Sequence, residues 1–251
     1  RRSRAAAVIE ADGLVVSPGF IDVHDHTDIG LLVNPRAESA VRQGVTTLVS
    51  GNCGGSPFPL TDEGAAEMRK ALAEDYGLAA DWRDIAGFLG RIESSGAALN
   101  YATFIGNGTL RAAVMGYADR PASAVELERM KALVAEAMAG GALGLSTGLE
   151  YTPSSFASTE ELIELSRIAA RAGGVYATHM RNEDATVLEA VAEALRIARE
   201  TPIRLQISHL KIGDAANWPK LDKLLDDLDK ARAAGIDLRC DRYPYIAGAT
   251  T

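Results

Sequence analysis

Two histidines stand two residues apart at the end of residues 17–26, which read SPGFIDVHDH. A Pro-Gly break precedes the apolar residues 20–23, and this pattern predicts a short buried strand. Side chains on a strand repeat every second residue, so His24 and His26 are expected to point the same way. Two imidazoles side by side at a strand end can bind one divalent metal ion. The pattern alone is common, so the rest of the chain has to support this interpretation.

The other candidate ligands also follow predicted strands. The sequence holds four histidines in all, which are His24, His26, His179 and His209. Cys53 follows the β-branched residues 45–50 in a glycine-rich loop that can turn sharply. Imidazole and thiolate both suit zinc, which makes Cys53 a candidate ligand. Cys240 lies inside an apolar run and is interpreted as a buried hydrophobic residue.

The elements that must position these side chains alternate along the chain. Seven β-favouring runs cover residues 20–23, 45–50, 99–105, 143–146, 174–179, 204–209 and 236–241. Helices are predicted between most of them, over residues 37–43, 123–139, 158–172, 186–200 and 218–234. A longer polar region with helical stretches follows residue 55 and extends through residues 82–92. The helices at Ser123 and Ser158 begin with capping boxes, because a glutamate follows each serine by three residues.

This alternation, without a Gly-x-Gly-x-x-Gly turn, favours an α/β fold of the TIM-type (β/α) barrel kind over a doubly wound sheet. We expect an incomplete barrel with strands 1–7 in residues 17–251. Residues 8–16 contain two β-favouring runs around Asp12-Gly13, a hairpin signal, so residues 1–16 are assigned to the remnant of a small β domain. The chain has no initiator methionine, and we expect it to be cut from something longer.

Composition narrows the class of partner. The 251 residues are 47% hydrophobic and 24% charged, which is ordinary for a soluble enzyme. A net charge of −8 argues against nucleic acid and anionic membranes, and no apolar run approaches the roughly 20 residues that span a bilayer. Two cysteines make no disulfide framework, which predicts a reducing compartment, the cytoplasm. Composition therefore argues against nucleic acid and membrane partners, and the small-molecule substrate expected here comes from the family resemblance given below.

Two cations stand near the predicted ligands. Lys211 follows His209 by two residues, and Arg181 follows His179 in the same way. Most lysines and arginines at such a rim are simply solvated. Because both cations have the same spacing from a histidine, the alternative is that one of them binds a substrate carboxylate. The dipeptide 150–151, Glu-Tyr, could line the same mouth or serve only in packing.

Several motifs together resemble one known family. They are GFIDVHDH, QGVTTLVSGNCGGSPFPL, GLSTGLEYTP, YATHMRNE, ISHLKIGDAANW and CDRYPYIAGATT. Through these motifs, residues 13–251 resemble the N-acyl-D-amino-acid deacylases (D-aminoacylases) of the amidohydrolase superfamily. The resemblance implies a metal-dependent TIM barrel beside a small β domain, and hydrolysis of the linear amide bond of N-acyl-D-amino acids. It also implies zinc, with one ion tightly bound and a second, weaker site left open.

The resemblance carries roles to particular positions. The implied metal ligands are His24, His26, Cys53, His179 and His209. Tyr151, Lys211 and Tyr243 match positions near the substrate carboxylate and acyl group, and Arg181 joins this substrate-binding set by its spacing. Many relatives have histidine where this chain has Asn107, so any role of the third strand is in doubt.

The catalytic residue implied by the family is an aspartate at the end of the eighth strand, and these residues stop just past the seventh. Asp22 and Asp25 adjoin the histidines but are expected to support the structure or the ligands, not to act as the base. Two alternatives stay open. A cyclic-amide hydrolase of the dihydropyrimidinase type usually has a carboxylated lysine on the fourth strand, and residues 142–148 contain no lysine. The other alternative is an inactive fragment that only binds metal.

Overall fold

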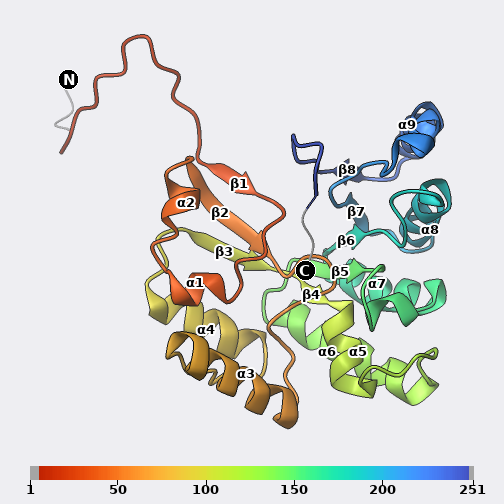
Figure 1. Cartoon of the computed structure of the whole chain (residues 1–251), viewed down its shortest axis with the longest axis horizontal. Helices are drawn as coiled ribbons and strands as arrows, with labels where there is room; N and C mark the ends of the chain where they lie inside the picture. Colours follow the sequence, from red (N-terminus) through yellow and green to blue (C-terminus); the bar gives the residue numbers. More distant parts are fainter. Residues whose placement is uncertain (1–5, 249–251) are drawn as a thin grey trace.

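All strand pairings in the computed structural model are parallel, and the structure describes residues 6–248 (Figure 1). The first sheet has the order β1-β2-β3, with β1 at Phe20–Asp22, β2 at Val45–Ser50 and β3 at Asn100–Thr103. The second sheet has the order β4-β5-β6-β7-β8. Its strands are β4 at Ile105–Gly106, β5 at Gly144–Gly148, β6 at Val175–His179, β7 at Arg204–Ile207 and β8 at Leu238–Cys240.

The helices lie outside the strands, which follow one another in chain order (Figure 1). After β1 come α1 at Gly30–Val33 and α2 at Glu38–Val41, and after β2 come α3 at Asp62–Tyr76 and α4 at Ile85–Ser95. The second sheet is accompanied by α5 at Asn107–Met115, α6 at Ala124–Ala139, α7 at Thr159–Arg171, α8 at Val187–Glu200 and α9 at Leu221–Ala233. Two short 3₁₀ helices, η1 at Ser154–Phe156 and η2 at Ala215–Lys220, precede α7 and α9.

The predicted third strand is divided at Phe104 into β3 and β4. The Phe104 amide donates to the carbonyl of Ser50 at the end of β2, and the Leu143 amide just before β5 donates to the carbonyl of Thr103. The chain around Phe104 is therefore hydrogen-bonded to both neighbouring strands. Strands therefore occupy the seven predicted positions, and the two sheets meet at this point. The parallel order with helices outside confirms an incomplete TIM-type barrel.

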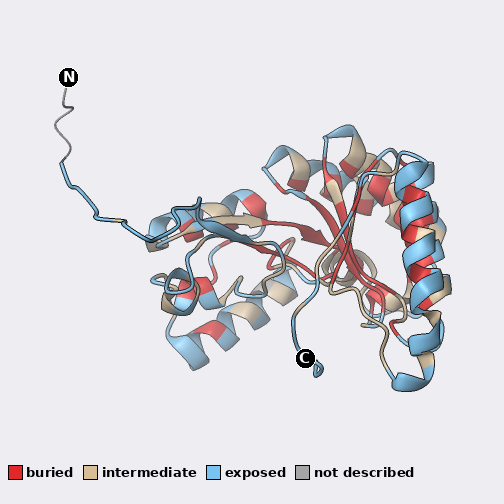
Figure 2. Cartoon of the chain, turned by 90° about the horizontal axis from the view of Figure 1, so that it is seen from above, coloured by how far each residue is buried: buried red, intermediate tan, exposed pale blue. Residues whose placement is uncertain are grey.

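The main core lies between the strands and the helices of both sheets, where the interiors of the elements are buried (Figure 2). All five residues of β5 are buried, as expected for a parallel strand covered on both faces. Helix α6 begins at the predicted capping box, with Ser123 and Glu126 bonded to each other's backbone. At α7 only half of the predicted box forms. Ser158 accepts from the Glu161 amide, while the Glu161 side chain turns into the core and binds Arg111.

The beginning of the chain differs from expectation. Strand β1 is not buried, because Phe20 and Ile21 are each 60% exposed and β2 is the only strand that pairs with it among the described residues. The turn at Asp12-Gly13 forms, with the Leu14 amide bonded to the Ala11 carbonyl, but its flanks do not pair as a hairpin. Val15 is 94% exposed, so apolar β-favouring residues here have no sheet to join. Assignment of residues 1–16 to a small β domain stays a prediction.

Residues 1–5 of that segment, and residues 249–251 at the end of the CDRYPYIAGATT motif, lie outside the described residues. Across residues 6–248, none of the helices has the length and apolar character that crossing a bilayer requires.

Candidate metal centre

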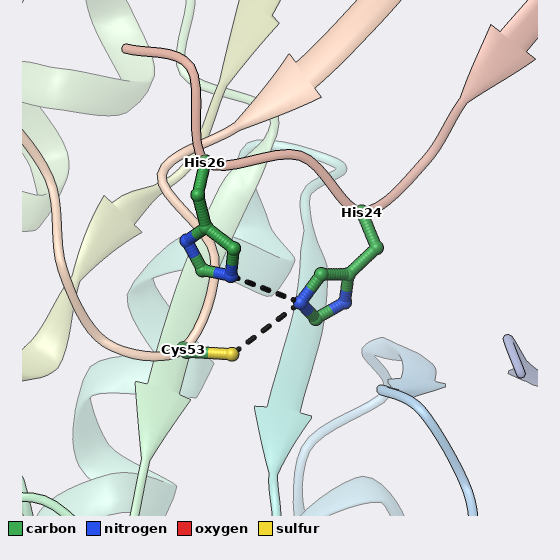
Figure 3. A group of neighbouring side chains, drawn as sticks. All are labelled: His24, His26 and Cys53. Atoms are coloured by element: carbon green, nitrogen blue, oxygen red, sulfur yellow. Dashed lines mark hydrogen bonds between the residues drawn. The ribbon is translucent and has the colours of Figure 1, made fainter. Parts of the chain in front are cut away.

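The first pair of predicted ligands sits just beyond β1. The Nε2 atoms of His24 and His26 lie 3.3 Å apart, so both rings point to one place although they belong to an irregular segment (Figure 3). Asp22 and Asp25 do not enter this place. Asp22 accepts from the His24 amide, and Asp25 accepts from the Ser50 hydroxyl and the Thr27 amide. Both aspartates therefore shape the loop that carries the histidines, in line with the expectation that neither is the base.

Cys53 reaches the histidines from the loop after β2. Its Sγ lies 3.4 Å from Nε2 of His24 (Figure 3) and 3.6 Å from Nε2 of His209. The backbone of Cys53 has φ of 52°, a left-handed conformation that is uncommon outside glycine. The close packing of Gly148 holds this turn in place, because a Cβ on Gly148 would lie 2.1 Å from the Cys53 carbonyl oxygen.

The second pair of histidines comes from the other sheet. His179 is the last residue of β6, and His209 follows β7 with φ of 36°. Their ring centroids lie 4.5 Å apart, and the rings of His209 and His24 lie 5.0 Å apart. The structure therefore brings all five predicted ligands together from both sheets, as parallel strands with adjoining carboxyl ends require.

The cluster fits a divalent metal ion. Ligand atoms of His24, His26 and Cys53 lie within 4.8 Å of one another, and so do those of Cys53, His179 and His209. Cys53 belongs to both groups, so it stands between two possible ion positions. Within the described chain, Nδ1 of His24 and Nδ1 of His179 are buried without a hydrogen-bond partner. A group of soft sulfur and imidazole donors matches zinc chemistry.

Local electrostatics keep two of the histidines, His26 and His179, in their ligand form. Burial lowers the pKa of His26, with a further lowering from His24 nearby. Burial also lowers the pKa of His179, so both imidazoles are neutral near pH 7. Burial, reinforced by the Glu183 and Asp241 carboxylates, raises the pKa of Cys53 to about 12. Its thiol therefore keeps a proton until a cation replaces it.

Three carboxylates support the ring nitrogens, and sequence reasoning did not assign them this role. Oε2 of Glu150 lies 3.2 Å from Nε2 of His179. Oε1 of Glu183 lies 2.7 Å from Nδ1 of His209, although Oε1 counts among the buried atoms without a well-aligned hydrogen-bond partner. Oδ1 of Asp241 lies 3.6 Å from Nδ1 of His24 and accepts from the His209 amide.

Two of these carboxylates remain ionised. Burial alone would raise the pKa of Glu183, but the close contacts with His209 and Lys211 outweigh it and lower the pKa. Burial is likewise outweighed at Asp241, where contacts from His24 and from the amide of His209 lower the pKa. Carboxylates of this kind fix the orientation of metal-binding histidines in many proteins.

A cavity of about 1050 Å³ opens onto the cluster. Three predicted substrate-binding residues line it, which are Tyr151, Lys211 and Tyr243. The Tyr151 ring packs edge-on against His179 at 4.7 Å between centroids, and Lys211 Nζ lies 5.7 Å from the centre of the Tyr243 ring. Lys211 also pairs with Glu183 and lies 3.1 Å from Nδ1 of His209.

Arg181 is not brought to this cavity, which corrects its placement in the substrate-binding set. Its guanidinium forms a two-point ion pair with Glu193 of α8, with both N···O distances 2.9 Å. The remaining donors bind the carbonyls of Ser155 and Ala157. The two-residue spacing from His179 failed here because β6 ends at His179, and strand alternation no longer holds beyond it.

Asn107 is the first residue of α5 and also does not line the cavity. Its side chain accepts from the Ser154 hydroxyl at 2.7 Å, and Ser154 does line the cavity. The Asn107 amide lies 3.4 Å from Glu161, which pairs with the fully buried Arg111. Asn107 therefore joins a buried polar network behind the cavity wall.

Comparison with known proteins agrees with this geometry. The chain is 41% identical over 242 residues to the D-aminoacylase of Alcaligenes xylosoxydans xylosoxydans, covering 96% of this chain and 49% of that protein. A solved D-aminoacylase described as having a binuclear metal centre superposes with a TM-score of 0.83 at 40% identity, covering 92% of this chain and 48% of the other. The N-acyl-D-glutamate deacylase of Bordetella bronchiseptica, solved with zinc and a phosphonate inhibitor, gives a TM-score of 0.81 at 36% identity, covering 91% and 48%.

The chain thus spans about half the length of the curated relatives that it matches over nearly its whole length. A sequence profile described as the amidohydrolase family matches residues 7–242, which include every predicted metal ligand. With that match and the parallel barrel around a histidine and cysteine cluster, the chain belongs to the amidohydrolase family.

Proposed function

We propose that this chain provides the metal-binding part of a zinc-dependent enzyme that hydrolyses the amide bond of N-acyl-D-amino acids. The products would be a carboxylate and a D-amino acid. The observation that carries the proposal is the convergence of Cys53 and the four histidines at the floor of a cavity that also contains Lys211 and Tyr243. The substrate class is supported by the D-aminoacylase and D-glutamate deacylase relatives.

The residues divide into three roles. Cys53 and the histidines would hold the metal, with Cys53 shared between two positions if a second, weaker ion binds. A bound divalent metal polarises an amide carbonyl and lowers the pKa of water toward about 7. Lys211 would bind the substrate carboxylate, and Tyr151 and Tyr243 would line the space around the acyl amino acid.

Proton transfer is assigned outside this set. Among the described residues, the carboxylates nearest the cluster already contact ring nitrogens: Glu150, Glu183 and Asp241. A carboxylate bound to a ligand histidine is poorly placed to accept a proton from a nucleophile and to pass it to a leaving amine. The family resemblance places an aspartate at the end of the eighth barrel strand, which is not β8, because β8 is the seventh of the predicted strands. That aspartate stays the proposed base.

A cyclic-amide substrate is the second candidate, and nothing in the site favours it. Strand β5 has the sequence GLSTG and offers no lysine to hold two metals, whereas Cys53 belongs to two groups of candidate ligands and would be available to both. The metal-only alternative differs from both candidates because it predicts zinc binding without turnover of any amide.

The test uses the natural protein that carries these residues, loaded with zinc. Its hydrolysis of N-acetyl-D-methionine, N-acetyl-L-methionine and dihydrouracil is compared by measuring released amine and ring opening. The proposal expects turnover of the D-acyl amino acid, at least tenfold above the L-enantiomer and the cyclic amide. Preference for dihydrouracil would support the second candidate, and stoichiometric zinc without hydrolysis would support the metal-only alternative. The His209→Ala variant, which lacks one candidate ligand, is the negative control. A histidine outside the cluster cannot serve as a matched control, because all four histidines of the sequence lie in it.

A further inference from the structure

Nδ1 of His209 has two competing neighbours. Oε1 of Glu183 lies 2.7 Å from it, and Nζ of Lys211 lies 3.1 Å from it. The other ring nitrogen, Nε2, faces Sγ of Cys53 at 3.6 Å, on the side of the metal cluster. One neighbour of Nδ1 can only accept a proton and the other can only donate one.

The two neighbours demand opposite tautomers. A neutral imidazole carries one ring proton, so Nδ1 donates to Glu183 only if Nε2 is free of hydrogen. Nε2 then offers its lone pair to a metal. If Lys211 instead donates to Nδ1, the ring proton must sit on Nε2, and that nitrogen cannot bind a metal.

Distance, burial and charge favour the first arrangement, whereas the 2.7 Å contact between Oε1 and Nδ1 is not aligned as a hydrogen bond. Glu183 is only 7% exposed, and its contact with Nδ1 is shorter than that of Lys211. Its second oxygen, Oε2, pairs with the ammonium of Lys211 and so draws this donor toward the carboxylate. An anionic acceptor forms the stronger hydrogen bond of the two alternatives at Nδ1.

We propose that Glu183 is a positioning residue that sets the ring proton of His209 on Nδ1 by accepting it there and by occupying Lys211. This inference rests on the proposed metal centre, although it does not depend on which amide is the substrate. It also predicts that Lys211 is harmful to metal binding when Glu183 is absent. If Glu183 acted only by packing, the loss of zinc affinity on its removal would not depend on the presence of Lys211.

His179 provides an internal comparison. Its Nε2 contacts Glu150 while Nδ1 is buried without a partner, so a carboxylate also orients this ring. Within the described chain, the contacts of His179 include carboxylates and rings but no lysine ammonium. Loss of Glu150 should therefore weaken metal binding less than loss of Glu183.

The experiment measures zinc affinity by competition with a chromophoric chelator. The variants are Glu183→Met, Lys211→Met, the double variant, Glu150→Met and the control Asp184→Asn. Methionine keeps the length of Glu183 without an acceptor, and Asp184 is an exposed neighbour that does not line the cavity. We expect Glu183→Met to bind zinc 10–100-fold more weakly, as loss of a ligand's outer partner typically does. Adding Lys211→Met should recover at least threefold of that loss, and Asp184→Asn should stay within twofold of the natural protein.

Imidazole ¹⁵N chemical shifts of the metal-free proteins provide the second readout. The spectrum is simple to assign because the sequence has four histidines. The proton of His209 should sit on Nδ1 in the natural protein and move to Nε2 in Glu183→Met. The inference is overturned if Glu183→Met matches Asp184→Asn in affinity, if the double variant binds as weakly as Glu183→Met, or if the tautomer does not change. Failure of the natural protein to bind zinc would overturn the metal centre as well. If the variants show the expected zinc affinities but the natural protein does not hydrolyse acyl amino acids, only the proposed activity is refuted.

Discussion

Sγ of Cys53 lies 3.6 Å from Nε2 of His209, although the two residues are 156 positions apart in the sequence. Cys53 follows β2 in the first sheet, and His209 follows β7 in the second. A metal held by both residues would therefore join the two sheets directly.

Metal removal is expected to lower thermal stability for this reason. A ligand that binds only the folded protein at a thousand times its Kd adds about 4 kcal/mol to the free energy of unfolding. For a protein of this size, that corresponds to a fall in Tm of roughly 8–16 °C on chelation. Differential scanning calorimetry with and without a chelator measures the change. The Cys53→Ala/His209→Ala double variant should not respond to the chelator, and an equal response in both proteins would contradict a metal that links the sheets.

Metal binding should also release a proton. Burial, with Glu183 and Asp241 nearby, raises the pKa of the Cys53 thiol to about 12, whereas a metal-bound cysteine is a thiolate. The lowered pKa values of His26 and His179 leave these rings already neutral near pH 8. One proton per zinc should therefore leave between pH 7.5 and 9, and apparent affinity should rise about tenfold per pH unit.

Calorimetry of zinc binding in two buffers with different ionisation enthalpies gives this proton count. The Cys53→Ala variant should release close to none over the same range. Zinc binding by the natural protein without proton release would mean that the thiol is not a ligand.

Lys211 is expected to bind the substrate carboxylate, because its ammonium lines the cavity beside the metal cluster. A charge-assisted hydrogen bond commonly contributes about 1.5–3 kcal/mol, so Lys211→Met should raise KM for N-acetyl-D-methionine roughly 10–100-fold. The uncharged N-acetyl-D-methioninamide should show little change. Lys223→Met, at an exposed ion pair with Asp227 on α9, is the matched control. Equal effects on the acid and its amide would rule out a carboxylate contact.

Arg181 should behave in the opposite way. Its pKa is raised by the hydrogen bonds that it donates to Glu193, and its other donors bind two loop carbonyls. Arg181→Met should therefore lower the free energy of unfolding by about 1.5–3 kcal/mol, the range for hydrogen bonds to charged groups. Urea denaturation measures this loss, and KM should stay within about twofold. A higher KM at unchanged stability would restore the sequence-based role for Arg181.

The sequence predicts the seven strand positions because each is a short apolar or β-favouring run between breaks, although β1 is exposed and β5 has only one β-branched residue. It also predicts that the histidines converge, since each follows such a run. The N-terminus of α5 escaped prediction, because Gly106 caps it without a side-chain hydrogen bond and Asn107-Gly108 disfavours helix. The valines of residues 8–16 have β propensity, but propensity without a partner strand does not make a sheet.

The supporting carboxylates could not be read from spacing. Glu183 lies in a loop after β6 and meets His209 only because β6 and β7 are neighbours. Glu150 contacts His179 across adjacent strands in the same way. Their only sequence signal is inclusion in the motifs GLSTGLEYTP and YATHMRNE, which name segments without assigning contacts. Arg181 shows the converse error, where regular spacing extended past the end of a strand.

The participation of Cys53 in the metal centre is the claim that most needs a direct measurement. Cobalt(II) substitution provides it, because a cobalt–thiolate bond gives a charge-transfer absorption band in the near ultraviolet that imidazole and carboxylate ligands do not give. The natural protein and Cys240→Ser should show this band, since the other free cysteine, Cys240, lies in β8 and belongs to none of the potential metal-binding groups. Cys53→Ser should lose the band. A band that persists in Cys53→Ser, or that disappears in Cys240→Ser, would contradict a metal centre built on Cys53.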